Sequence, residues 1–310
     1  MALSTPIAFF LFNRPDLAEI VFSSIAKARP KKLFVVADGP RFAEEADACQ
    51  QSRTVIEDVD WECEVVTDFS ETNLGCKKRI SSGLNWVFSE VEEAIILEDD
   101  CLPAPSFFNF CEACLDRYRD DERIMMVSGN NFQRGWRNGQ DSYFFSKYVH
   151  IWGWATWRRA WQHYDVDMTT WPDYKKAGRI RSICEDPWEQ KYWTDVFDAT
   201  FDGRVDTWDY QWCYACWSRG GLSILPSHNL ISNIGFGPNA THTNQHPDLA
   251  ALPTVDLWDI IHPRSVARDK EADRYTFEHV ISGRAMRDKG LKSTIKGHLS
   301  SMALRIKSLI

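Results

Sequence analysis

Three consecutive carboxylates follow directly behind an apolar run in the stretch Ala94-Ile95-Ile96-Leu97-Glu98-Asp99-Asp100. The apolar run predicts a buried strand, and in an open α/β sheet the ligand crevice lies at the carboxyl ends of the strands. Acidic side chains crowded at such an end repel one another unless a cation neutralises them. Oxygen ligands favour a hard ion, so the stretch predicts a Mg²⁺ or Mn²⁺ site that is shared with a diphosphate. An acidic turn on the surface is the alternative interpretation.

Two more apolar runs, upstream of this stretch, also end in polar residues. Residues 7–12 lead into Arg14, and residues 33–37 lead into Asp38. Helical periodicity separates the two runs, which predicts a strand, a helix and a second, parallel strand. Further apolar runs extend this pattern to residue 127. The sequence therefore predicts an α/β fold, with a mostly parallel, twisted sheet and helices on both of its faces.

The composition argues against nucleic acid as a partner. The chain has 310 residues, and its 36 basic and 44 acidic side chains give a net charge of −8, whereas a phosphate backbone demands clustered Lys and Arg. Nine cysteines form an odd set in hydrophobic or helical surroundings, which favours reduced thiols and a cytoplasmic location. Neither a signal peptide nor a run of membrane-spanning length is visible, and this agrees with a cytoplasmic location.

Residues 284–310 differ from the rest of the chain in their charge. Seven basic residues against one acid give them a net charge of +6, and their apolar residues follow helical spacing. Such a basic amphipathic helix predicts peripheral contact with an anionic inner membrane leaflet. A loosely packed terminal helix or a frayed tail is the alternative, because Gly290 and Gly297 weaken a helix.

Tryptophan is concentrated in the second half of the chain, where most of the 14 tryptophans follow Trp136. Aromatic rings stack on sugar rings, and they also fill hydrophobic cores. Trp152 and Trp154 are therefore candidates for the floor of an acceptor-binding site or for a packed corner of the core. Asn130, at the end of a predicted strand, is a candidate to hydrogen-bond sugar hydroxyls, with capping of the strand end as the alternative.

Several short motifs follow one another in a characteristic order. They are a polar pair behind the first strand, an Asp behind the second, a basic helix start, the acidic triplet and two Trp-containing motifs: Asn13-Arg14, Asp38, Lys77-Lys78-Arg79, Glu98-Asp99-Asp100, Gly153-Trp154 and Trp208-Asp209. This order resembles the nucleotide-sugar glycosyltransferases of the GT-A fold, and within them the inverting N-acetylglucosaminyltransferases that begin the branching of N-glycans. The resemblance covers roughly residues 5–245. It implies two abutting Rossmann-like halves, as in a bacterial family 2-like glycosyltransferase.

The resemblance also implies roles for individual residues. Arg14 and Asp38 would contact the uracil of a UDP-sugar. Asp100 would be the main protein ligand of the metal ion, and Glu98 and Asp99 would lie near the ribose and the diphosphate. The identity of the acceptor is not carried over from the family.

Asp209 is implied to be the catalytic base. A carboxylate on the far face of the sugar accepts the proton of the attacking hydroxyl, and in-line attack then inverts the anomeric carbon. Asp206 is the competing candidate, and Asp209 is favoured by its Trp-flanked position and its match to the family. Arg79 is a candidate to neutralise the diphosphate, or else a solvated charge at a helix start. His242 is a candidate metal ligand, with a solvated loop histidine as the alternative.

Together these features predict an inverting, metal-dependent hexosyl- or N-acetylhexosaminyltransferase. It would move a sugar from a UDP-sugar to a hydroxyl of a glycan or glycoconjugate in polysaccharide biosynthesis. The predicted domains are a nucleotide-sugar-binding half (1–131), an acceptor-binding and catalytic half (132–250) and a C-terminal helical extension with the basic tail (251–310). Two other functions stay open: a sugar-phosphate nucleotidyltransferase, although residues 13–16 lack the glycine-rich loop that it needs, and a non-catalytic carbohydrate-binding protein.

Overall fold

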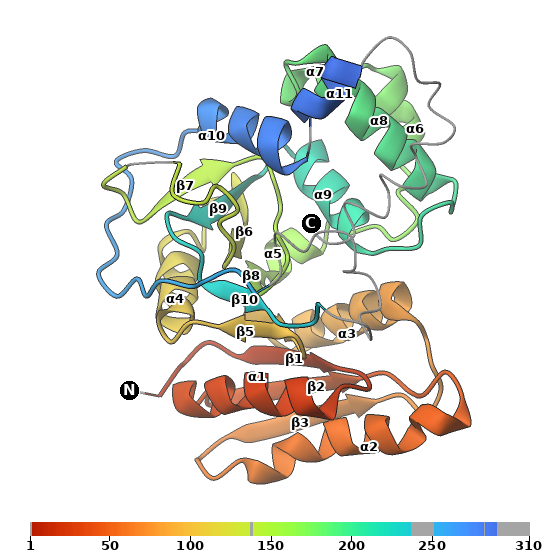
Figure 1. The fold of residues 1–310 in the computed structure, drawn as a ribbon, viewed down its shortest axis with the longest axis vertical. Coiled ribbons are helices and arrows are strands. Elements are labelled where there is room, and N and C mark those ends of the chain that lie inside the picture. Colours follow the sequence, from red (N-terminus) through yellow and green to blue (C-terminus); the bar gives the residue numbers. More distant parts are fainter. Residues whose placement is uncertain (1, 137–138, 237–250, 282, 290–310) are drawn as a thin grey trace.

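One sheet extends through both halves of the chain. The computed structural model describes residues 2–136, 139–236, 251–281 and 283–289. Within these ranges eight strands form the sheet (Figure 1), in the order β3 (Glu64–Phe69), β2 (Lys32–Ala37), β1 (Ile7–Leu11), β4 (Glu93–Glu98), β8 (Trp154–Trp157), β6 (Ile124–Ser128), β9 (Leu222–Pro226) and β7 (Tyr143–Ser146). All but β8 and β7 run in the same direction. The predicted α/β class with a mostly parallel sheet is confirmed.

The strands of the first half end level with one another. β1 is buried along its whole length and β2 nearly so, as parallel strands covered on both faces are, and each therefore has a continuous apolar sequence. In the parallel pairing Leu11 lies beside Ala37, and Phe10 lies beside Glu98. The polar residues that follow these strands therefore meet at one edge of the sheet. β4 and β2 flank β1 on opposite sides, so this edge includes the switch point at which α/β sheets bind ligands.

Helices connect the strands and cover both faces of the sheet. In chain order they are α1 (Pro15–Ala28), α2 (Ala46–Thr54), α3 (Cys76–Glu90), α4 (Ser106–Arg117), α5 (Arg158–Trp161), α6 (Trp171–Lys176), α7 (Ile180–Ile183), α8 (Pro187–Phe201), α9 (Asp209–Ser218), α10 (Lys270–Tyr275) and α11 (Gly283–Lys289). Shorter helical turns are η1 (Ala43–Glu45), η2 (Val55–Asp58) and the π-helix η4 (Thr276–Val280). A small antiparallel sheet is formed by β5 (Cys101–Pro103) and β10 (Ile231–Asn233).

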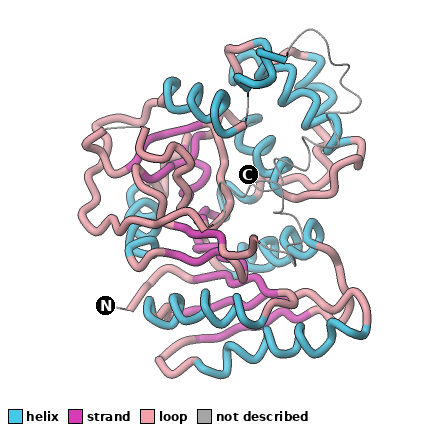
Figure 2. The backbone as a smooth tube through the Cα atoms, in the orientation of Figure 1, coloured by secondary structure: helices cyan, strands magenta, loops and turns pink. Residues whose placement is uncertain are grey.

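The side chains of β8 show which helices cover which face, because successive side chains of a strand point to opposite faces. Trp154 packs against Trp212 of α9 with ring centroids 5.7 Å apart. The indole N–H of Trp157 instead donates to the carbonyl of Leu115 in α4. α9 and α4 therefore cover opposite faces, and α5 shares the face of α9 because Trp161 also packs against Trp212. Figure 2 shows the strands enclosed between helices in this way.

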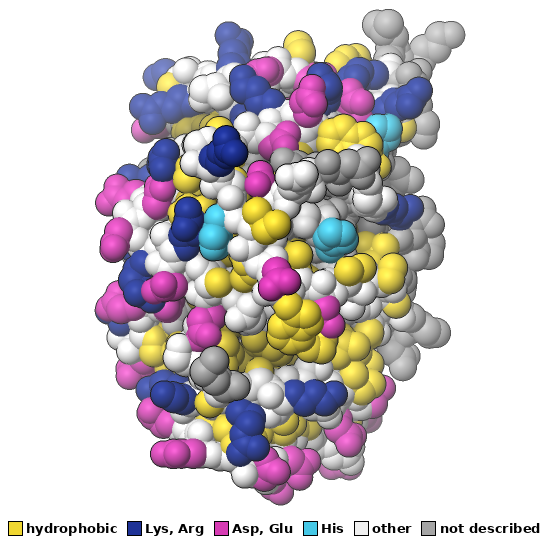
Figure 3. Space-filling model, turned by 90° about the vertical axis from the view of Figure 1, so that its left-hand side faces the viewer, with side chains coloured by type: hydrophobic (Ala, Val, Ile, Leu, Met, Phe, Trp, Pro, Cys, Tyr) yellow, Lys and Arg dark blue, Asp and Glu magenta, His cyan; other side chains and the backbone are white. Residues whose placement is uncertain are grey.

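The segment 251–269 runs along the left side of the molecule in Figure 1 and leads to α10 beside β7. Hydrogen bonds from its backbone N–H groups hold it in place. Leu257 donates to the Ser106 hydroxyl at 2.8 Å, and Asp269 donates to the carbonyl of Phe145 at 2.8 Å. On that side of the molecule, charged residues of both signs lie interspersed with hydrophobic ones (Figure 3). The large apolar side chains that this segment leaves exposed include Val255, Trp258 and Ile261.

No helix in the described ranges is long and apolar enough to cross a membrane. The predicted basic tail is described only at its start, in α11, where Arg287 pairs with Asp186 at 2.9 Å and with Glu278 at 3.0 Å. Residues 290–310 lie outside the described residues, so their contact with a membrane stays a prediction. The domain boundaries also stay predictions, and the pairing of β6 with β8 joins the first two predicted domains in one sheet.

Candidate functional site

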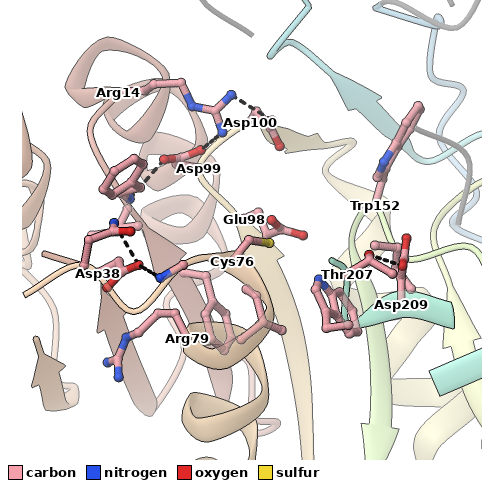
Figure 4. A pocket seen from close by; sticks show the side chains of 18 of the residues that line it. Arg14, Asp38, Cys76, Arg79, Glu98, Asp99, Asp100, Trp152, Thr207 and Asp209 are labelled. Atoms are coloured by element: carbon pink, nitrogen blue, oxygen red, sulfur yellow. Dashed lines mark hydrogen bonds and ion pairs between the residues drawn. The ribbon is translucent and has the colours of Figure 1, made fainter. Parts of the chain in front are cut away.

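A pocket of about 320 Å³ opens where the strands of the first half end and where α9 begins, and this volume is typical of small-molecule sites. The acidic triplet, residues 98–100, lines one side of it. Asp38 and the start of α3 border it below, while Trp152 and Asp209 line the opposite side (Figure 4). The structure thus brings together residues from both halves of the chain that the sequence analysis singled out.

Arg14 is the positive charge that lies directly against the acidic triplet. Its guanidinium pairs with Asp99 and, at 3.0 Å, with Asp100. Asp99 also accepts the backbone N–H of Phe12 at 3.2 Å, which ties the triplet to the end of β1. Burial alone would lower the pKa of Arg14, but Asp99 and Asp100 raise it above its ordinary value. Arg14 therefore stays charged and neutralises part of the triplet, and its contact with uracil stays a prediction.

Glu98 differs from its neighbours because, among the described residues, its carboxylate has no hydrogen-bond or ion-pair partner. Burial, together with Asp100 and Asp99, raises the pKa of Glu98 to about 8. Burial also raises the pKa of Asp99 to about 6, although Arg14 opposes this shift. Burial is the largest cause of both shifts, and the negative charge of the neighbouring carboxylates adds to it.

The oxygen donors of this wall fit a hard divalent cation. A cation beside Glu98 and Asp100 would relieve the excess negative charge that raises the pKa of Glu98. Among the described residues, no group of three His, Cys, Asp or Glu side chains is arranged to hold a metal ion. Mg²⁺ and similar ions commonly use one or two carboxylates and complete their coordination with water and substrate phosphates. The residues present therefore fit such an ion together with a phosphate group.

The segment that follows β10 passes close over the acidic triplet. The backbone N–H of Ile234 donates to the carbonyl of Asp100 at 2.9 Å, and that of Gly235 donates to the side chain of Asn233 at 2.9 Å. A Cβ atom on Gly235 would lie 2.7 Å from a guanidinium nitrogen of Arg14 and would also overlap the Asp100 side chain. A side chain here would therefore displace the ion pair, so the close approach requires glycine.

Asp38 organises the loop that leads into α3. Its carboxylate accepts hydrogen bonds from four N–H groups, those of Gly39 (2.9 Å), Leu74 (2.9 Å), Gly75 (3.0 Å) and the Asn73 side chain (3.1 Å). These bonds fix the residues immediately before α3 at the border of the pocket. Asp38 thus has a clear structural task, and its contact with uracil stays a prediction.

Asp209, the first residue of α9, faces the acidic triplet across the pocket (Figure 4). Its Oδ1 atom accepts hydrogen bonds from the hydroxyl of Thr207 and, at 2.8 Å, from the backbone N–H of Tyr210. Asp209 is buried, whereas the competing candidate Asp206 borders the same pocket but is exposed. A buried carboxylate with a fixed orientation suits proton transfer better than an exposed one, which favours Asp209 as the base.

The three predicted acceptor-binding residues take different positions. Trp152 borders the pocket, whereas Asn130 and Trp154 are buried behind its wall. Asn130 accepts the backbone N–H of Trp152 at 3.1 Å, and Trp154 stacks on Trp208 with ring centroids 5.8 Å apart. Asn130 and Trp154 therefore support the residues that form the wall and do not form it themselves.

Two predicted residues remain, Arg79, which lines the same pocket as the acidic triplet, and His242. The buried guanidinium of Arg79 pairs with the carboxylate of Asp68 at 2.8 Å, and in Figure 4 it extends away from Glu98. Its role in neutralising a diphosphate stays a prediction. His242 lies outside the described residues, so its metal contact stays a prediction.

The residues at the site that escape the sequence analysis include Thr207, Cys76 and Gly235. Thr207 precedes Asp209 by two residues, a spacing at which a hydroxyl can bond a nearby carboxylate, so the sequence did contain a usable signal. Cys76 borders the pocket as the first residue of α3, but a single cysteine gives no signal in the sequence. Gly235 has none either, because its approach to Arg14 and Asp100 depends on the tertiary structure.

Comparison with known proteins gives remote structural likenesses only. No family model matches the chain, and no curated protein matches it significantly. The solved structures similar to it include the mannosyltransferase PcManGT from Pyrobaculum calidifontis in complex with GDP-Man and Mn²⁺, at 13% identity and a TM-score of 0.38, over 98% of this chain and 70% of that one. A UDP-glucose pyrophosphorylase complexed with UDP-glucose is 11% identical with a TM-score of 0.27, over 46% and 62% of the two chains. A CMP:2-keto-3-deoxy-manno-octonic acid synthetase complexed with CTP is 13% identical with a TM-score of 0.31, over 56% and 87%.

Proposed function

We propose that the protein is an inverting, metal-dependent glycosyltransferase that moves a sugar from a UDP-sugar to a hydroxyl of a glycan or glycoconjugate. The observation that carries the proposal is the placement of Asp209 opposite Glu98 and Asp100 in one pocket. An in-line displacement at a sugar carbon needs charge stabilisation on the side of the leaving group and proton removal on the side of the attacking hydroxyl. The two walls of the pocket offer these two functions.

The acidic wall would receive the diphosphate. Glu98 and Asp100 would hold a Mn²⁺ or Mg²⁺ ion, which when bound supplies Lewis-acid stabilisation of the departing diphosphate. Arg14 keeps the Asp99 and Asp100 side chains in place through its ion pairs and adds a fixed positive charge at this wall. The choice of uridine follows the resemblance at Arg14 and Asp38.

The opposite wall would receive the acceptor. Asp209 would take the proton of the acceptor hydroxyl while the hydroxyl oxygen forms its bond to the anomeric carbon. The bond from that carbon to the diphosphate oxygen breaks on the other side, so the configuration inverts. Trp152 borders the pocket on the same wall as Asp209 and offers an aromatic surface for a sugar ring.

The two alternative functions make less use of this arrangement. In a nucleotidyltransferase the attacking group is a phosphate oxygen that is already ionised, so a buried carboxylate opposite the acidic triplet would have no proton to remove. A carbohydrate-binding protein would need neither the triplet nor Asp209. Both alternatives leave Asp209 without a task, which favours the glycosyltransferase.

Release of free nucleoside diphosphate tests the proposal. The protein is incubated with Mn²⁺ and UDP-glucose, UDP-galactose, UDP-N-acetylglucosamine or GDP-mannose, with water or added oligosaccharides as acceptors. We expect release from a UDP-sugar, and an Asp209→Asn variant should lower the rate by about a hundredfold or more while calorimetry shows unchanged donor binding. Asp202→Asn, at the exposed end of α8, is the matched control.

Each other outcome has a defined meaning for the proposal. No release from any nucleotide sugar would contradict it, and formation of pyrophosphate from a nucleoside triphosphate and a sugar phosphate would identify a nucleotidyltransferase instead. Loss of activity in Asp206→Asn but not in Asp209→Asn would move the role of base to Asp206. Retention of the anomeric configuration in the product, read by NMR, would contradict inversion.

A further inference from the structure

Thr207 holds one oxygen of the Asp209 carboxylate. It stands in the turn before α9, borders the pocket and is 7% exposed. Its hydroxyl donates to Oδ1 of Asp209, and Figure 4 shows the two side chains joined by this bond. The backbone N–H of Tyr210 donates to the same oxygen at 2.8 Å. Two donors therefore converge on Oδ1 from the two sides of Asp209 in the sequence.

The position of Thr207 is itself fixed by packing. Trp208, the next residue, stacks on Trp154 of the central strand β8 with ring centroids 5.8 Å apart. The turn before α9 is thereby anchored to the sheet, and Thr207 with it. A carboxylate group rotates easily about its last torsion angle, so a donor on a fixed turn selects one orientation of the Asp209 side chain.

We infer that Thr207 is a positioning residue that orients the carboxylate of Asp209 for proton transfer. The inference rests on the proposed function, in which Asp209 is the base. A hydrogen bond to one carboxylate oxygen also stabilises the ionised form, which is the form that accepts a proton. Thr207 therefore has two effects on Asp209: it orients the carboxylate, and it stabilises the ionised form.

The pH dependence of turnover reports this role, because Thr207 does not titrate and acts only through its neighbour. Among the described residues, the titratable groups whose pKa values the charge of Asp209 raises include Glu98 on β4, Tyr164 after α5, and Tyr210 and Cys213 on α9. A Thr207→Val substitution leaves all of them in place. Loss of the hydroxyl should raise the pKa of the base, so the acidic limb of the kcat profile should move to higher pH.

The test compares Thr207→Val, Thr207→Ser and a matched control in the nucleoside diphosphate release assay. We expect Thr207→Val to lower kcat by about tenfold or more with an unchanged donor KM, and Thr207→Ser to restore both kcat and the acidic limb. The control is Thr200→Val in α8, where a buried threonine hydroxyl bonds the carbonyl of Val196 at 2.9 Å, away from the pocket. It removes the same group and should change neither kcat nor the pH profile.

Asp209→Asn separates failure of this inference from failure of the proposed function. If Asp209→Asn is inactive while Thr207→Val keeps the kcat and pH profile of the wild type, only the role of Thr207 is overturned. If Thr207→Val lowers the melting temperature but not kcat, Thr207 is merely structural and the inference is again overturned. If Asp209→Asn itself turns over normally, both the base and its positioning residue are wrong.

Discussion

Trp152 donates its backbone N–H to the side-chain oxygen of Asn130 at 3.1 Å. Asn130 follows the buried strand β6, and Trp152 borders the pocket. The bond therefore ties one wall of the pocket to the end of a strand in the middle of the sheet. The amide nitrogen of Asn130 is buried without a hydrogen-bond partner among the described residues. The side-chain nitrogen of Asn130 is thus unsatisfied, and its side-chain oxygen contributes by accepting the hydrogen bond from Trp152.

Replacement of Asn130 by Ala should destabilise the fold and impair turnover together. The substitution leaves the N–H of Trp152 buried without its acceptor, which costs about 1–3 kcal/mol of the free energy of unfolding. Urea denaturation measures this loss. Asn85→Ala is the control, because Asn85 also accepts a tryptophan N–H, that of Trp161 at 2.8 Å, but is exposed. Equal urea midpoints for the two variants would show that the bond to Trp152 is unimportant.

Alkylation of Cys76 should block nucleotide binding. Cys76 borders the pocket and is exposed, whereas the other cysteines of the chain are buried or half-buried. We expect N-ethylmaleimide to modify Cys76 first, as mass spectrometry can show, and a nucleotide sugar with Mn²⁺ to slow the reaction. A Cys76→Ser variant should keep its activity under the reagent. Full activity of protein that is fully alkylated at Cys76 would argue against substrate binding in this pocket.

A Gly235→Ala substitution should weaken the use of metal and diphosphate more than it weakens the fold. The added methyl group would press on Arg14 and Asp100, so the carboxylate would have to leave its present position. We expect a KM for Mn²⁺ that is higher by about tenfold, since a small misplacement of a binding group has large effects. Ser232→Ala, on β10, is the control. A normal KM for Mn²⁺ in Gly235→Ala would show that the acidic triplet tolerates the displacement.

Glu112 of α4 should make the stability of the protein depend on pH. Its carboxylate accepts the backbone N–H groups of Ser4 and Thr5 at 2.9 and 3.0 Å. Burial opposes ionisation, but these bonds prevail and lower the pKa of Glu112 below its ordinary value. The resulting stabilisation is fully present above the pKa of an unfolded glutamate and is lost as the pH falls through the lowered pKa.

Glu112→Gln removes this stabilisation, so the wild type should have the higher urea midpoint near pH 7. The difference should shrink once the pH falls below the pKa of glutamate in unfolded chains, about 4.3, and should vanish only below the lowered pKa of Glu112. Glu19→Gln, on the exposed side of α1, controls for the loss of a charge. A difference between wild type and Glu112→Gln that stays constant with pH would show that the hydrogen bonds of Glu112 are not linked to its ionisation.

Much of the first half can be predicted from its sequence because parallel strands buried on both faces have continuous apolar sequences. The ends of β1, β2 and β4 then draw attention to Arg14, Asp38 and the acidic triplet, and the level ends of the strands bring these residues together. Asp209 is found through its Trp-flanked motif. These signals lie in short stretches of sequence, so they can be recognised without the tertiary structure.

Strand β8 and the ion pairs of the site could not be predicted from the sequence, because both depend on residues that are far apart in the chain. The strand Trp154–Trp157 has the same aromatic character as a core or a sugar-binding surface, and only its antiparallel pairing with β4 and β6 defines it. Likewise, the sequence does not show that Arg14 bridges Asp99 and Asp100, or that Arg79 turns to Asp68. Side-chain directions of this kind are decided by packing.

The central position of β8 has a consequence for how substrates enter and leave. β8 pairs directly with β4, which carries the acidic triplet, and its Trp154 supports Trp208 beside Asp209. One wall of the pocket thus belongs to β4, and the other is packed against the adjacent strand β8. We therefore expect donor and product to exchange through small movements at the rim of the pocket and not through separation of two lobes.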